Sequence, residues 1–352
     1  MTSRTRYFMG GSAAILVAGL GTGLVAYYGG GFPSLSASRS GPSELSYVPA
    51  DAAVVAFANV REVMDSQLRQ RLKQVLPQEQ GQKEFQAETG IDIEHDIDYV
   101  VAAMTMSDSG VRDPNGLVVA RGRFNTTQLE SLARDHGGVV EEYKGKRLIK
   151  APGGHSKTVI LAFLEPGLVA IGSESAIRGS IDAQLSSHSI SSNNEMMELI
   201  ADIDNGNNAW AVGRFDAIAN QAKMPAEIAS RLPAVKTFAV MTHIDGGVSG
   251  SIRAETRDDA SADNLRQVVQ GMLALGRMSG DPKATALLNS LQLSGSGKTV
   301  RLSFAVPSEV LDMIPLKAIH DGQHADVMKE LHSRAPAAPK PPTPPPPPTP
   351  ER

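Results

Sequence analysis

The sequence predicts an α+β protein built from two similar strand–helix–hairpin–helix units with mostly antiparallel sheet, preceded by one transmembrane helix. Three observations support this fold class. An uncharged run of 22 residues lies near the N-terminus, and strand-like and helix-like periods alternate from residue 47 to about 320. The same order of elements then recurs after a serine- and asparagine-rich stretch at 186–194. With 41% hydrophobic and 20% charged residues, the chain can bury a core.

Shifts in composition divide the chain into five parts. The predicted parts are a transmembrane anchor at 1–28, a flexible linker at 29–46, a first α+β unit at 47–190, a second unit at 191–322 and a disordered tail at 323–352. Gly, Ser and Pro dominate the linker, which is typical of flexible chain. The tail is rich in proline, which favours an extended polyproline II conformation without a core.

The predicted anchor is the uncharged run from Tyr7 to Tyr28. As a helix it would span about 30 Å, the thickness of a bilayer's hydrocarbon core. Arg4 and Arg6 precede it, so the positive-inside rule predicts a single-pass inner (cytoplasmic) membrane protein with its N-terminus inside. Its body would lie outside, in the periplasm of a Gram-negative cell. A cleaved signal peptide, with small residues at Ser36-Ala37-Ser38, is the alternative.

Small residues recur at every fourth position of this run. They are Gly10, Ala14, Ala18, Thr22 and Ala26. Such a face lets two helices approach closely in lipid, so it is compatible with a homodimer. The segment Gly21–Ala26 also fits a loose dinucleotide-binding pattern, but it lacks the preceding strand and the later acidic residue that a cofactor site needs.

The first unit begins with an apolar strand at 54–58. Asn59 and Glu62 form a capping-box pattern before a helix that Pro77 ends. The strands expected next cover 99–106, 117–124, 139–143, 147–150, 158–164 and 168–171, with helices opening at Asn125 and Ser173.

The second unit repeats this order from a strand at 209–212. A weak helix to about Leu232 precedes strands at 235–244 and 248–254, which flank the hairpin signal Asp245-Gly246-Gly247. A one-sided helix at about 260–275 and strands at 291–293 and 300–306 complete the unit, and Ser308 caps a short last helix.

Composition excludes several classes of function. The chain has no cysteine, which removes disulfides, thiol catalysis and cysteine-ligated metals. Its net charge is −4, without the basic surplus of a nucleic-acid binder.

Motifs that suggest chemistry lack their required context. Gly295–Thr299 resembles the end of a phosphate loop, but an alternating strand follows where a helix is needed. The acidic cluster Asp92, Glu94, His95, Asp96 and Asp98 and the segment Asp202–Asn207 approach calcium loops without their fixed positions. The remaining candidates are histidines: His320, His324 and His332 near the tail, and His136 and His155 in single positions. We therefore predict no catalytic, cofactor-binding or metal-binding residue.

Several phrases together resemble a known group of proteins. They are the start Tyr47–Ala52, the strand and helix of 54–76, Thr89–Asp92, Asp98–Val100 and the paired halves. This pattern is similar to bacterial exported, membrane-anchored proteins of unknown function with duplicated α+β domains. The resemblance implies a location outside the cytoplasm and brings no catalytic residues with it.

These observations favour a membrane-anchored extracytoplasmic protein that acts as a non-enzymatic binding or scaffold protein of the cell envelope. An envelope hydrolase with an unrecognised site and a small-molecule carrier are the alternatives. The expected partners are the bilayer, through Tyr7–Tyr28, a second copy and an envelope protein. An open sheet edge or an exposed apolar patch would favour the binding protein.

Overall fold

The structure is a computed structural model. It describes residues 42–75, 86, 87, 89–105, 115–135, 137–152, 158–203, 206–215, 234–278 and 287–307. The chain divides into two units, Met1–Leu311 and Asp312–Arg352, and all described residues belong to the first.

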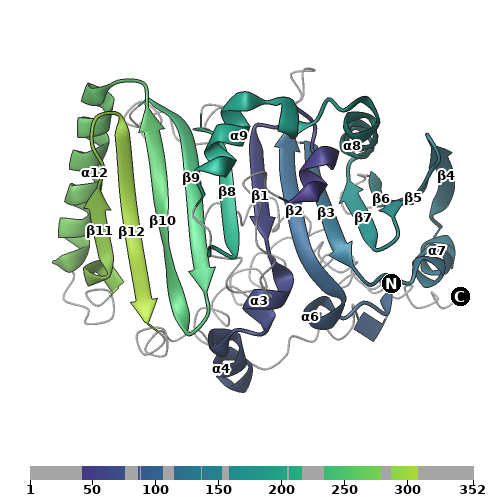
Figure 1. Cartoon of the computed structure of the whole chain (residues 1–352). Helices are drawn as coiled ribbons and strands as arrows, with labels where there is room; N and C mark the ends of the chain where they lie inside the picture. Colours follow the sequence, from purple (N-terminus) through teal and green to yellow (C-terminus); the bar gives the residue numbers. More distant parts are fainter. Residues whose placement is uncertain are drawn as a thin grey trace, which may run out of the picture. The chain divides into compact units, whose positions relative to one another are not determined.

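Twelve antiparallel strands form a single sheet (Figure 1). The strands are β1 (Val54–Ala58), β2 (Ile97–Thr105), β3 (Asn115–Gly122), β4 (Val139–Tyr143), β5 (Lys146–Pro152), β6 (Thr158–Glu165), β7 (Leu168–Gly172), β8 (Ala209–Arg214), β9 (Val235–Ile244), β10 (Gly247–Thr256), β11 (Leu291–Ser294) and β12 (Thr299–Pro307). Their spatial order is β11-β12-β10-β9-β8-β1-β2-β3-β7-β6-β5-β4. Within the described part of the chain, β11 and β4 are therefore the two edges.

The two halves of the sequence meet inside the sheet, where β1 pairs with β8. Phe57 of β1 lies opposite Trp210 of β8 and opposite Val101 of β2. From this junction the order is β1-β2-β3-β7-β6 in one direction and β8-β9-β10-β12-β11 in the other, and β5 and β4 extend the first arm.

The predicted fold class is wrong, because the strands form one continuous antiparallel sheet instead of separate strand–helix–hairpin–helix units. The physical reason is that β1 and β8 are apolar on both faces and would be costly as open edges. Pairing them buries both. The predicted boundary between residues 190 and 191 stays a prediction.

The predictions that place this protein in a membrane are contradicted by the described helices. Among the residues that the structure describes, no helix is long and apolar enough to cross a membrane. This finding contradicts the transmembrane helix, the signal anchor and the single-pass membrane localisation. The predicted anchor at Tyr7–Tyr28, with its small-residue face, lies outside the described residues.

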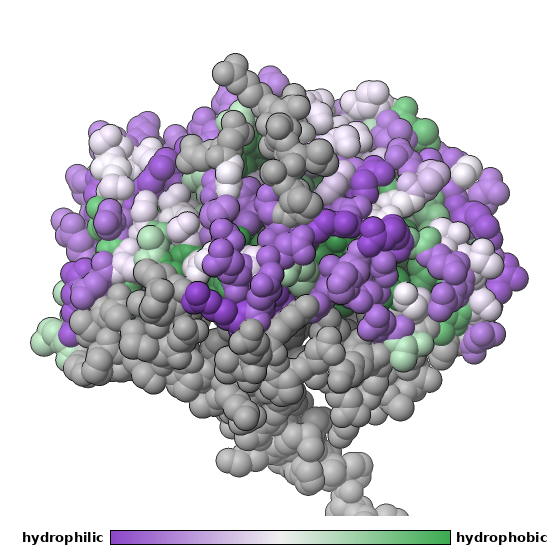
Figure 2. All heavy atoms as spheres, turned by 60° about the horizontal axis from the view of Figure 1, so that its bottom comes forward, coloured by the Kyte–Doolittle hydropathy of each residue, from purple (hydrophilic) through white to green (hydrophobic). Residues whose placement is uncertain are grey.

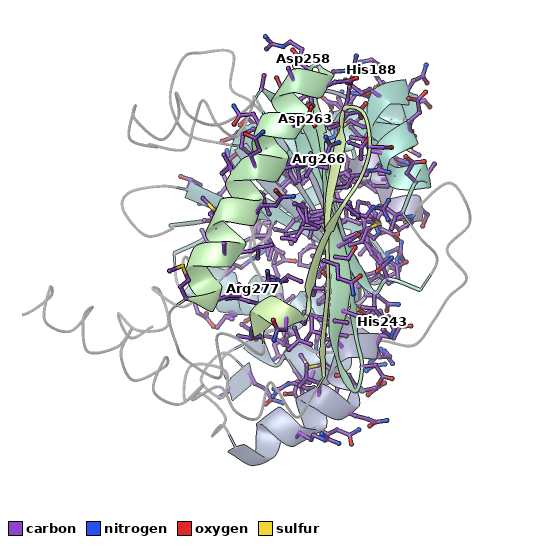
Figure 3. All side chains as sticks on the ribbon, turned by 90° about the vertical axis from the view of Figure 1, so that its left-hand side faces the viewer. His188, His243, Asp258, Asp263, Arg266 and Arg277 are labelled. Atoms are coloured by element: carbon purple, nitrogen blue, oxygen red, sulfur yellow. The ribbon has the colours of Figure 1, made fainter. Side chains whose placement is uncertain are left out.

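Helices cover both faces of the sheet. They are the 3₁₀ helices η2 (Ser43–Tyr47) and η4 (Ile190–Ser192), and the α-helices α3 (Val60–Met64), α4 (Gln67–Val75), α6 (Ile93–Asp96), α7 (Thr126–Asp135), α8 (Glu174–Ser186), α9 (Asn194–Ala201) and α12 (Asp259–Arg277). Figure 3 views the sheet from the β11 side and shows α12 on one side of the strands, with other helices on the opposite side. We call the side covered by η2, α8 and α9 the first face, and the side covered by α3, α4 and α12 the second face.

The largest part of the core lies on the first face. Alternate residues of the central strands, such as Val55, Val101 and Val119, belong there to one buried cluster with Ile177 and Ile181 of α8. A smaller cluster on the second face joins Val63 and Leu68, from α3 and α4, to alternate strand residues such as Val100. Because successive side chains of a strand point to opposite faces, the central strands contribute apolar residues to both layers.

One predicted helix is interrupted. The segment from Val60 to Val75 forms α3 and α4 instead of a single helix. Ser66 lies at the break, where its hydroxyl donates to the carbonyl of Val63 and accepts from the amide of Arg69. This hydroxyl gives the backbone an alternative to continuous helix bonds, as serine commonly does.

Other local predictions are confirmed. Ser173 caps α8 by accepting from the amide of Ala176, and β9 and β10 join at Asp245-Gly246.

Residues 43–46, assigned to the linker from sequence, belong to η2, where Leu45 is buried. Pro77, the weak helix to Leu232, the Ser308 cap and the proline-rich tail lie outside the described residues.

Candidate functional site

The carboxylates of the acidic cluster at residues 92–98 are bonded to neighbouring groups of the protein. Asp92 caps α6 by accepting from the amide of Glu94 at 2.9 Å, and its other oxygen lies 2.8 Å from Nδ1 of His95. Asp96 accepts from the amide of Asp92 at 2.9 Å. The cluster is therefore a helix start with its capping bonds.

The two remaining carboxylates of this cluster bind arginines of α3 and α4. Glu94 lies 2.5 Å from Arg69, and Asp98 pairs with Arg61. Within the described residues, no group of three or more metal-ligating side chains is placed to hold an ion. These ion pairs join α4 to α6 and α3 to β2.

The phosphate-loop resemblance at Gly295–Thr299 is a hairpin turn between β11 and β12. Gly295 has a φ of +107°, and a Cβ there would lie 2.4 Å from the carbonyl oxygen of Thr299. Glycine is thus required by the turn itself. Because the strand β12 follows Lys298, this loop does not lead into a helix as a phosphate loop does, in line with the alternating pattern of the sequence.

Of the other sequence candidates, the structure describes part of one, the segment Asp202–Asn207. Asp202 follows α9 and pairs with Arg253 of β10 at 3.0 Å. The candidate histidines His136, His155, His320, His324 and His332 lie outside the described residues.

Sequence reasoning missed a buried charged network on the first face. Glu44 of η2 is only 1% exposed, and its Oε1 accepts from Nε of Arg121 at 2.6 Å and from the Tyr99 hydroxyl at 3.1 Å. Tyr47 donates to Glu165 at 2.7 Å, and Arg121 also lies 3.6 Å from Glu165. One guanidinium therefore lies between two carboxylates, and two phenols complete the network.

This environment shifts the titration of the network. Burial raises the pKa of both phenols, with a further rise from Glu165 for Tyr47 and from Glu44 for Tyr99. Burial lowers the pKa of Arg121, but the hydrogen bond to Glu44 and the electrostatic interactions with Glu44, Tyr99 and Glu165 together outweigh this and leave the pKa raised. The phenols stay neutral and Arg121 stays charged, so the network ties η2 to β2 and β3 at neutral pH.

A different kind of surface lies at the other end of the sheet, around α12. Along the sequence from the start of β10 to the end of β12, the buried apolar side chains among the described residues are only those of Ala262 and Val300. Ile252 of β10 is 41% exposed, and Leu265 and Leu273 of α12 are half-buried. Since α12 contacts β10, β11 and β12, these residues line a layer that is apolar but incompletely packed.

The two ends of α12 meet the sheet differently. In the half nearer its start, Arg266 donates to the carbonyls of Gly297 and Thr299 at 2.7 and 3.0 Å. Figure 3 shows this end close to the strands, and the end at Arg277 further from them. The helix is thus fixed at the β11–β12 turn and leans away along its length.

Edge strand β11 borders this layer. Its residues alternate, with Leu291 and Leu293 half-buried and Gln292 and Ser294 exposed. Leu293 pairs with Leu302, on the face that carries α12. We call the set Ile252, Leu265, Leu273, Leu291, Leu293 and Leu302 the α12 layer. On the face that it draws, Figure 2 shows mostly hydrophilic residues with hydrophobic patches between them.

Glu62 gives a pH-dependent prediction. Burial, with the nearby charge of Asp245, raises its pKa above the usual 4.5, although His243 opposes the shift. A raised carboxyl pKa stabilises the fold below about pH 4.5, and this contribution is lost as pH rises through the folded-state value. Glu62→Gln should therefore gain stability relative to the wild type between pH 4 and pH 7, measured by urea unfolding. A difference that stays constant or falls with pH would refute this prediction.

Comparisons with known proteins give a family but no activity. Residues 10–270 match the family described as "Protein of unknown function (DUF3352)". No curated protein matches the chain. A solved structure titled "Structure of crystal form I of TP0453" is 8% identical with a TM-score of 0.46, covering 76% of this chain and 95% of that chain. The predicted resemblance to proteins of unknown function is thus confirmed, while its exported, membrane-anchored character is not shown. The match covers most of the sequence, and the chain belongs to the DUF3352 family.

Proposed function

We propose that this protein is a non-enzymatic binding protein that takes up an extended segment of a partner protein along β11. The observation that carries the proposal is the α12 layer, an apolar layer incompletely packed and open at an edge strand. A partner strand paired with β11 would place every second side chain in this layer. It would bury apolar area and satisfy the outward backbone groups of β11 together.

The backbone of β11 favours a peptide over a lipid or other apolar small molecule. An edge strand presents N–H and C=O groups in a row, and these groups bind another strand. An acyl chain could fill the α12 layer, but it could not pair with those groups. Met272 and Met278, exposed on and just after α12, add flexible apolar side chains that adapt to a partner.

The other edge strand, β4, is a poorer binding site of this kind. Glu141 and Glu142 occupy opposite faces of β4, and Glu141 is paired with Lys150 and Arg178. A partner on β4 would therefore meet a carboxylate on either face. This makes β4 a natural control for β11.

Site-specific photocrosslinking tests the proposal in cells that express the full chain. A photoreactive residue replaces Gln292 in β11 or, as the control, Glu142 in β4. We expect crosslinks from position 292 to a segment with alternating apolar residues in a partner protein. Crosslinks from position 142 alone, or from neither position, would overturn the proposal.

Two aspartate substitutions, one inside the α12 layer and one on α8, test whether the crosslink depends on that layer. Ile252→Asp places a charge in this layer and should reduce the crosslink at position 292 at least tenfold. Leu185→Asp changes a residue of similar size and exposure on α8 and should leave the crosslink unchanged. Equal yields in both variants would show that the crosslink does not depend on the apolar layer.

A further inference from the structure

Two arginines lie directly opposite each other on the first face, near edge strand β11. Arg253 of β10 pairs in register with Arg301 of β12, and Arg301 pairs with Ser294 of β11. Side chains at directly opposite positions have Cβ atoms about 4.5–5.5 Å apart, and like charges there destabilise a sheet. Such a pair calls for negative charge nearby.

Among the described residues, an acidic partner is present for one of the two arginines. Asp202 lies 3.0 Å from Arg253, whose side chain is 17% exposed. Arg301 is half-buried and has no acidic partner among the described residues. Glu255, two register pairs further along and therefore on the same face, lies opposite Thr299 and forms no ion pair with a described residue. Within the described residues, Arg301 therefore has no ion-pair partner of its own beside β11.

We propose that Arg301 recognises a carboxylate on the partner strand that adds to β11, an inference that rests on the function proposed above. The partner segment then has a defined chemistry. Its apolar residues face the α12 layer, and an aspartate or glutamate lies on the opposite side, next to Ser294.

The spacing of strands allows this contact. Adjacent strands lie about 4.8 Å apart, so an added strand lies about two such spacings from β12. Ser294, which stands between them in this row, has a short side chain that leaves the space above it open. An arginine reaching outward and a glutamate reaching inward meet over that serine, and the guanidinium can hold both carboxylate oxygens.

A second copy of this chain does not supply the same chemistry. Pairing β11 with its own copy would bring leucines together on the second face, but it would add two more arginines on the first face. Pairing β11 with β4 of another copy would place Glu141 or Glu142 against Leu291 and Leu293, whichever face is aligned. The charge pattern therefore favours a different, acidic partner.

Two labelled peptides test the inference against the full-length protein by fluorescence anisotropy. The first is Lys-Val-Thr-Val-Glu-Val-Thr-Lys, and the second carries glutamine instead of glutamate. We expect the glutamate peptide to bind the wild type about three- to fivefold more tightly, a ratio typical of a partly exposed ion pair. The ratio should fall to one in Arg301→Gln and should be partly restored in Arg301→Lys, which keeps the charge but not the two-pronged guanidinium.

The possible outcomes separate the two proposals. Equal binding of both peptides to the wild type would overturn the role of Arg301 and leave strand addition intact. Binding of neither peptide would overturn both proposals. Concentration-dependent dimers in sedimentation velocity, abolished by Leu293→Lys, would show that a second copy occupies β11 and would also overturn the acidic partner. Because the glutamate–glutamine comparison uses the wild type, it holds even if an Arg301 variant were to misfold.

Discussion

Replacing Arg121 with alanine is expected to lower the free energy of unfolding by about 3–5 kcal/mol. The change leaves Glu44 buried at 1% exposure without its cation, and it also removes the ion pair with Glu165. An uncompensated buried charge costs far more than the intact pair contributes. Chemical denaturation of the wild type and the variant measures the difference.

A double substitution separates the cost of the orphaned charge from loss of packing. Glu44→Gln combined with Arg121→Met removes both charges and keeps similar volumes, so it should recover most of the lost stability. If the double variant is as unstable as Arg121→Ala, the packing of η2, and not the charge balance, explains the effect.

The second large effect is expected at Ile181 of α8. This side chain is wholly buried in the core of the first face, and Ile181→Ala should cost about 2–5 kcal/mol through lost apolar contacts and a cavity. Leu185, four residues further along the same helix, is 52% exposed. Leu185→Ala should therefore change stability by less than about 0.5 kcal/mol in the same denaturation experiment. Similar losses in both variants would contradict the assigned orientation of α8.

Local features of the fold could be predicted from the sequence because they depend on neighbouring residues. The glycine-rich turn at Asp245–Gly247, the Ser173 cap and the strand after Lys298 are examples. The joining of β1 to β8 could not be predicted, because alternation gives the faces of a strand and not its partners. The division of one helix at Ser66 also escaped the periodic pattern, since a single hydroxyl decides it.

The buried charged network and the opposed pair of arginines could not be predicted from the sequence for a related reason. Glu44 and Arg121 are 77 residues apart, and neither belongs to a known motif. A signal was present, because Arg121 is the last residue but one of an apolar strand and lies on the same face as the core residue Val119. The same holds for Arg253 and Arg301, whose opposition follows only from the pairing of β10 with β12. Charges at inward strand positions are thus the sequence signal worth following in this family.

Amide hydrogen exchange of the full chain, with and without the glutamate peptide, tests strand addition most directly. We predict slower exchange at Leu291–Ser294, whose outward amides gain acceptors when a strand pairs with β11, and no change at Val139–Tyr143 in β4. Protection at β4, or at neither edge while the peptide is bound, would contradict the claim that β11 is the binding edge.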